Sequence, residues 1–204
     1  MTWRIASVAG GIAVAATAIG SPLAHLDHHL LVAHMVQHLL LMLVAAPLIL
    51  LGMRSTALPQ TPAAVCWLAG SGAVILWRIP PVFDLALKST FWHEFEHASF
   101  FLAGLLFWRP VIGNSGWSAP VYLFLATLPC DALSAFLAFC GHVVYRSYLS
   151  AGTGMFGLSA LDDQELAGAL MWVAVTFFYL IPALVLAARL LSDEHNQAAE
   201  IRVA

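Results

Sequence analysis

The chain has 204 residues, of which 61% are hydrophobic and only 9% are charged, whereas a soluble domain carries about 25% charged residues. A net charge of −3 without a basic run excludes nucleic-acid binding, and the apolar composition excludes a disordered chain or a secreted disulfide scaffold. A bilayer-spanning helix needs roughly 20 apolar residues, so this composition predicts an all-α, polytopic transmembrane helical bundle. Its nine histidines outnumber its eight lysines and arginines.

Apolar stretches along the chain predict about six spans, at residues 5–20, 34–51, 62–77, 91–111, 119–144 and 166–191. Short connections between them indicate a single transmembrane domain, 1–204, whose last part, 192–204, is a polar cytoplasmic tail. The first stretch also fits a signal peptide, and we interpret it as a retained helix. With five basic residues on one face and three on the other, the charges favour an N-in, C-in topology. The three cysteines, Cys66, Cys130 and Cys140, are interpreted as core residues.

Eight of the nine histidines fall on one membrane face of this predicted bundle. They lie in the first loop (His25, His28, His29), at the start of the second span (His34, His38), at the start of the fourth (His93, His97) and at the end of the fifth (His142). Only His195 lies on the other side, in the polar tail. The N-in topology places the cluster on the extracytoplasmic side, where the first loop either admits a metal ion or is merely polar.

The spacing of four histidines points to a metal site. Residues four apart on a helix lie about 40° from each other, so His34/His38 and His93/His97 can each turn two imidazoles toward the bundle interior. His142 is a further candidate ligand, and Met42 on the second span is the last. Histidine together with methionine suits copper better than magnesium or calcium, with zinc as the alternative metal. Asp131, eleven residues before His142, is either a proton relay, a group that orients ligands, or a helix-packing hydrogen-bond partner.

Two other functions compete with a copper site. The run His93-Glu94-Phe95-Glu96-His97 satisfies both H-E-x-x-H and H-x-x-E-H, the patterns of zinc metalloproteases. Such a site leaves the second histidine pair and the His-rich loop unexplained. Haem needs only one histidine from each of two helices, for example His38 with His97 or His142, so an electron-transfer haem protein is the other alternative.

Three separated blocks of sequence resemble the multi-spanning CtaG family, the assembly factors of caa-type cytochrome c oxidase. They are His34-Met35-Val36-Gln37-His38 with Ala46-Pro47-Leu48, the His93 and His97 pair running into Phe107-Trp108, and Asp163-Gln164-Glu165-Leu166-Ala167-Gly168 with Met171-Trp172. The resemblance covers about residues 25–191. It implies a multi-pass protein of the bacterial plasma membrane that is no enzyme and that helps to insert copper into the oxidase.

The resemblance also implies partners and roles for residues. His34, His38, His93 and His97 match the family's motif positions, and Asp163 and Gln164 lie at the mouth of the sixth span. The implied partners are cytochrome c oxidase subunits or their copper chaperones, besides the lipid bilayer, and a homo-oligomer is compatible with the sequence. Within a copper site, we expect Asp163 and Glu94 to orient the imidazoles as hydrogen-bond acceptors.

Overall fold

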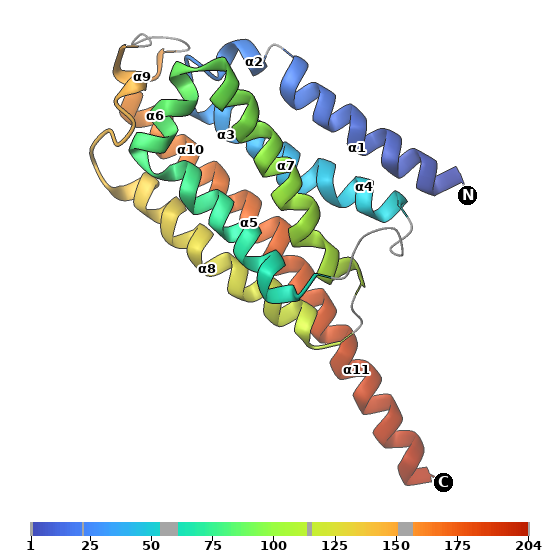
Figure 1. Cartoon of the computed structure of the whole chain (residues 1–204). Coiled ribbons are helices and arrows are strands. Elements are labelled where there is room, and N and C mark those ends of the chain that lie inside the picture. The colour runs from blue at the N-terminus through green and yellow to red at the C-terminus, as the bar shows by residue number, and fades with distance from the viewer. Residues whose placement is uncertain (1, 22, 54–60, 114–115, 151–156, 204) are drawn as a thin grey trace.

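The computed structural model is all-helical in the residues that it describes, which are 2–21, 23–53, 61–113, 116–150 and 157–203. Long helices run alongside one another, and the short helices α2, α6 and α9 gather at one end of the bundle (Figure 1). The helices in chain order are α1 (Thr2–Gly20), α2 (Leu23–Leu26), α3 (Leu31–Leu39), the π-helix η1 (Leu40–Ala45), α4 (Ala46–Gly52), α5 (Ala63–Arg78), α6 (Pro80–Lys88), α7 (Thr90–Gly113), α8 (Ser118–Phe139), α9 (Ser147–Ser150), α10 (Ala160–Val175), the π-helix η4 (Thr176–Leu180) and α11 (Ile181–Val203).

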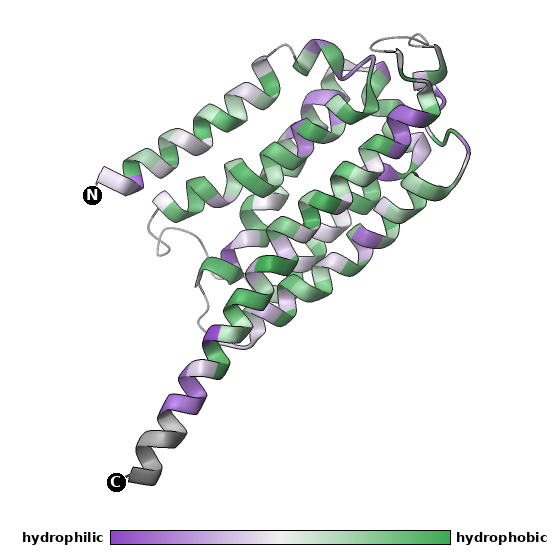
Figure 2. Cartoon of the chain, turned by 180° about the vertical axis from the view of Figure 1, so that it is seen from behind, coloured by the Kyte–Doolittle hydropathy of each residue, from purple (hydrophilic) through white to green (hydrophobic). Residues whose placement is uncertain are grey.

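Four helical stretches are long and apolar enough to cross a membrane: Thr2–Leu26, Leu31–Gly52, Ser118–Phe139 and Ala160–Asn196. The pair α5 and α6, bent by 78°, makes a fifth if it counts as one span. Helix α7 has 24 residues but falls outside this set, because Glu96, His97 and Arg109 lower its hydropathy. Figure 2 shows a mostly apolar bundle with hydrophilic residues near α2 and on the part of α11 that precedes its grey end. The six-span count and the N-in, C-in topology remain predictions.

Several helix ends differ from the sequence prediction. Helix α8 ends at Phe139, five residues before the predicted end of the fifth span, and Gly141 beyond it has a left-handed φ of +67°. Helix α10 begins at Ala160 because Ser159 and Asp162 form a capping box there. The polar tail predicted for 192–204 continues the helix α11 to Val203, and this helix extends away from the bundle (Figure 1).

Proline explains the π-helical turn that interrupts the second helix. Pro47 has no N–H, and the N–H of Ala46 bonds to the carbonyl of Leu41, five residues earlier. The carbonyl of Met42 therefore receives no hydrogen bond from Ala46, whose N–H is used elsewhere, and none from Pro47, which has no N–H. The indole Nε1–H of Trp108 on α7 donates to this carbonyl at 2.9 Å. The same pattern recurs at η4, where the N–H of Ile181 bonds to the carbonyl of Thr176 and Pro182 follows.

Small residues bring the helices into close contact at several places, of which Gly104 and Gly168 are two. A Cβ on Gly104 of α7 would lie 3.0 Å from the Cα of Met42 and 2.9 Å from the Cβ of Ala46. A Cβ on Gly168 of α10 would lie 2.9 Å from the carbonyl oxygen of Ser134 on α8. Close backbone approach at small residues is how membrane helices gain packing energy. At Gly104 it sets α7 against the helix that carries the first histidine pair.

Candidate metal centre

The two histidine pairs lie on adjacent helices and face each other. His34 and His38 on α3, and His93 and His97 on α7, are all buried. The ring centroids are 4.3 Å apart within the first pair and 4.5 Å within the second. Across the helices, the centroids of His34 and His93 are 5.6 Å apart, and those of His38 and His97 are 5.3 Å apart. The structure therefore brings together the four imidazoles that the i,i+4 spacing singles out.

A carboxylate lies among these rings, and it belongs to Glu96. Its Oε1 is 3.4 Å from Nε2 of His34 and 3.6 Å from Nε2 of His38, and the side chain is fully buried. One potential ligand atom from each of the three residues lies within 4.8 Å of the other two. We call His34, His38 and Glu96 the buried group. Two imidazoles and a carboxylate form a donor set that suits a divalent transition metal.

The polar atoms of this region have few partners among the described residues. Seven buried side-chain atoms make no hydrogen bond there: both nitrogens of His34, both of His97, Nε2 of His38 and both oxygens of Glu96. Native proteins normally pair such atoms, since a buried polar group without a partner costs free energy and a buried charge costs more. Nitrogen and oxygen atoms that converge without hydrogen bonds fit the coordination of a metal ion.

Arg78, at the C-terminal end of α5, approaches the buried group from the other side. Its Nη2 is 3.4 Å from Nδ1 of His38, and its guanidinium carbon lies 5.6 Å from the ring centre of Phe100. The ring of His38 stacks on Phe100 at 4.1 Å. A guanidinium can only donate a hydrogen bond, so Nδ1 of His38 is the acceptor in this contact. A neutral His38 then carries its proton on Nε2, the nitrogen that faces Glu96. His38 thus connects a buried cation to a buried carboxylate.

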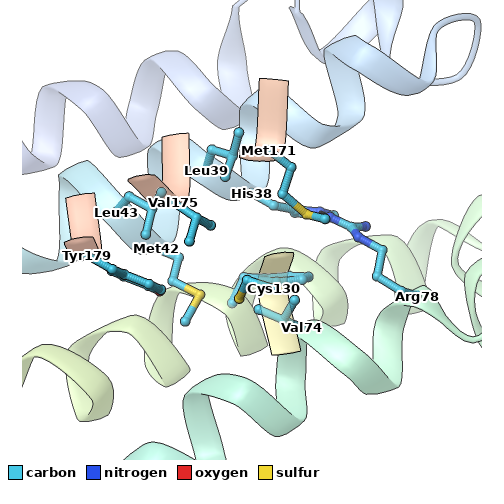
Figure 3. Close-up of a pocket in the computed structure, with 11 residues that line it drawn as sticks. His38, Leu39, Met42, Leu43, Val74, Arg78, Cys130, Met171, Val175 and Tyr179 are labelled. Carbon is cyan, nitrogen blue, oxygen red and sulfur yellow. Dashed lines mark hydrogen bonds between the residues drawn. The ribbon is translucent and has the colours of Figure 1, made fainter. Parts of the chain in front are cut away.

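Below His38, sulfur-bearing side chains line a small cavity of about 30 Å³ (Figure 3). Met42, Cys130 and Met171 border it from three different helices, together with Arg78. Met42, the last of the predicted ligands, therefore borders the same cavity as His38. The buried group itself consists of His34, His38 and Glu96.

A second group of possible ligands lies nearer the end of the bundle. Asp27, in the turn between α2 and α3, is buried, and its Oδ2 is 2.9 Å from Nε2 of His93. Nε2 of His28 is 3.8 Å from Oδ1 of the same carboxylate. The hydroxyl of Tyr148 donates to the backbone carbonyl of Asp27 at 2.6 Å and holds the turn in place. We call Asp27, His28 and His93 the outer group.

The charge of Asp27 is stabilised by its histidine neighbours. Burial acts to raise the pKa of this carboxyl group. The hydrogen bond from His93 and the charges of His93, His28 and His34 outweigh burial, so the pKa lies below its ordinary value. Asp27 therefore presents a carboxylate to both histidines of the outer group.

Asp163 and Gln164, at the start of α10, hold the surrounding backbone. Asp163 accepts hydrogen bonds from the backbone N–H groups of Leu31 and Val32, so both of its oxygens cap α3. Asp163 thus caps α3, and its predicted role as an imidazole acceptor stays a prediction. Gln164 accepts from the N–H of Val144 at 2.7 Å and donates to the carbonyl of His142 at 3.1 Å.

Other predicted site residues lie apart from the two groups. His142 is exposed, with Nδ1 2.8 Å from the carbonyl of Cys140. His25 and His29 are exposed in and beside α2. Glu94 is exposed as well, at the border of the cavity next to the outer group. Asp131 is half-buried, and its Oδ1 has no hydrogen-bond partner among the described residues.

Sequence reasoning did not assign Asp27, Glu96 or Arg78 to the metal site, and it named Glu96 only within the zinc metalloprotease pattern. Asp27 could have been found, because it is the one carboxylate within the His25–His29 loop. Arg78 lies at a predicted span end, and only the bend between α5 and α6 places it next to His38.

The chain matches the model of one protein family over residues 1–193, and that family is described as the cytochrome c oxidase caa3 assembly factor (Caa3_CtaG). This chain belongs to the caa3 assembly factor family. The family resemblance of the His34–His38 and Asp163–Gln164 blocks is thereby confirmed. No curated protein and no solved structure matches the chain. Membership indicates a non-enzymatic role in assembling the oxidase, and with it association with that enzyme.

Proposed function

We propose that this caa3 assembly factor binds copper as cargo between α3 and α7 and passes it on for insertion into cytochrome c oxidase. The observation that carries the proposal is the buried group, in which one ligand atom each of His34, His38 and Glu96 lies within 4.8 Å of the other two, amid buried nitrogen and oxygen atoms that make no hydrogen bonds among the described residues. Imidazole is a good ligand for copper, and the family's target is an oxidase. The proposed ligands are His34, His38 and Glu96, with His97 beside them.

The position of the site supports delivery rather than a closed structural role. The buried group lies in the first turns of α3 and α7, close to the end of the bundle where α2, α6 and α9 gather (Figure 1). We propose that this end faces the extracytoplasmic side of a bacterial plasma membrane. Oxidase subunits or their copper chaperones would meet the protein there.

The two alternatives fit the site less well. A zinc protease of the H-E-x-x-H type needs His93 and His97 on one ion with Glu94 beside it. Among the described residues, neither group of possible ligands contains both histidines, and Nε2 of His93 faces Asp27. The two cavities that border the histidines measure about 30 and 140 Å³, whereas a site for an organic ligand takes roughly 300 Å³ or more. Neither of these two cavities holds a haem.

Metal analysis combined with an absorption spectrum tests the proposal. The full-length protein is purified in detergent, loaded with a copper salt, desalted and analysed. We expect bound copper without a Soret band, and we expect the double variant His38→Ala/His97→Ala to lose the ion bound at the buried group. His195→Ala, an exposed histidine on α11, is the matched control. A protein that gains no copper, carries zinc and cleaves peptides, or shows a Soret band refutes the proposal.

A further inference from the structure

The outer group has the features of a binding site of its own. Asp27 has a fully buried carboxylate whose Oδ1 makes no hydrogen bond among the described residues, and Nδ1 of His93 has none either. The side chain of His28 is 50% exposed, so one ligand of this group reaches solvent. A bound ion is one explanation for buried polar atoms without partners, and the exposed His28 gives such an ion a ligand that reaches solvent.

A cavity lies directly beside the outer group. It measures about 140 Å³ and is bordered by Asp27, His28, His93, Glu94 and His97, among others. A water molecule occupies about 30 Å³ of liquid, so this space accommodates an ion with several waters. Glu94 at its border adds negative charge that attracts a cation. The cavity thus gives a hydrated ion access to the outer group.

The rings of the outer group continue into those of the buried group. His28 stacks on His93 with centroids 5.0 Å apart, and His93 is 5.6 Å from His34 and 4.5 Å from His97. His38 follows, at 4.3 Å from His34 and 5.3 Å from His97. Along this series the side chains change from half-exposed at His28 to fully buried at His34. A continuous series of neighbouring imidazoles therefore runs from the half-exposed His28 to the buried group.

We propose that Asp27, His28 and His93 form a second metal site, an entrance site that binds a hydrated divalent copper ion and hands it to the buried group through His93. Two imidazoles and one carboxylate, with waters completing the coordination, suit a divalent first-row cation. The handover exchanges ligands one at a time and needs no change in oxidation state. This inference rests on the proposed function, since it assigns a route to the same cargo.

Copper stoichiometry and loading rate test the entrance site. Wild-type protein, loaded with Cu²⁺ and desalted, should hold two ions per chain and give two distinct Cu²⁺ signals by electron paramagnetic resonance. Asp27→Asn should hold one ion and load it at least tenfold more slowly, as should His28→Ala. His28 is half-exposed, so its variant should keep the melting temperature of the wild type. His25→Ala, in the same His-rich segment and also exposed, is the control that should change neither quantity.

The outcomes separate the two proposals. If the wild type holds one ion, and Asp27→Asn and His28→Ala load the same amount at the wild-type rate, the entrance site is refuted and the proposed function stands. If the wild type holds no copper, the proposed function fails. The double variant His38→Ala/His97→Ala should retain the entrance ion alone, and its complete loss of copper would contradict an independent outer site.

Discussion

The carboxylate of Asp163 on α10 accepts a hydrogen bond from the backbone N–H of Leu31, 132 residues earlier in the chain. Leu31 is the first residue of α3, whose own N-cap residue, Leu30, provides no side-chain cap. A distant helix therefore supplies the cap that the local sequence lacks. Because His34 lies only three residues further on, this cap fixes the turn that carries the first imidazole.

Asp163→Ala should therefore destabilise both the helix and the site. Loss of a helix cap costs roughly 0.5–2 kcal/mol, and here it leaves the buried N–H of Leu31 and the half-buried N–H of Val32 without their acceptor. We expect a lower free energy of unfolding in detergent and weaker copper binding, with Asp163→Asn intermediate. Asp193→Ala, an exposed acid on α11, is the matched control. If Asp163→Ala matched the control in both measurements, the cap would have no energetic role.

Trp108→Phe tests the support for the π-helical turn beside the site. This substitution keeps an aromatic ring but removes the hydrogen bond to the Met42 carbonyl, and a buried carbonyl without a donor costs about 1–3 kcal/mol. We expect a loss of stability of that size in chemical denaturation. Trp172→Phe, where the side chain is 37% exposed, should change stability much less. Equal effects of the two substitutions would contradict the role given to Trp108.

Glu96→Gln and Glu94→Gln form a matched pair that tests which carboxylate serves the metal. Glu96 lies between His34 and His38, whereas Glu94 is exposed. A neutral amide in place of the buried carboxylate should lower copper affinity at equilibrium by at least about tenfold, or ~1.4 kcal/mol. Glu94→Gln should leave that affinity within about twofold. A larger effect at Glu94 would restore the assignment made from sequence and would favour a zinc protease.

Helical periodicity could not have chosen between these two glutamates. At 100° per residue, each of them lies about 80° from the direction midway between His93 and His97, on opposite sides. Only the packing of α3 against one side of α7 decides which glutamate is buried. The pairs themselves were predictable because i,i+4 spacing is local. Local spacing could not predict the positions of Asp27, Arg78 and the Asp163 cap, because turns and bends between helices bring these residues to the site.

The sequence predicted the end of the second helix closely but placed the end of the fifth span too late. The second helix closes at Gly52, one residue beyond the predicted span end. The predicted fifth span ran to residue 144 because Val143 and Val144 are apolar, but the chain turns at Gly141 and exposes His142. That turn also explains why His142, a predicted ligand, lies outside both groups.

Arg78→Gln should strengthen copper binding. The guanidinium places a permanent positive charge 3.4 Å from Nδ1 of His38, where it repels an incoming cation and holds the proton of His38 on the nitrogen that faces Glu96. A glutamine removes the charge, and its amide can still contact His38. We expect copper affinity to rise about tenfold, or ~1.4 kcal/mol, in competition titrations against a chelator. Arg189→Gln on α11 is the control, since it removes a positive charge far along the chain from the site. Unchanged or weaker binding by Arg78→Gln, with stability held at the wild-type value, would show that Arg78 supports the ligand set rather than opposing the ion.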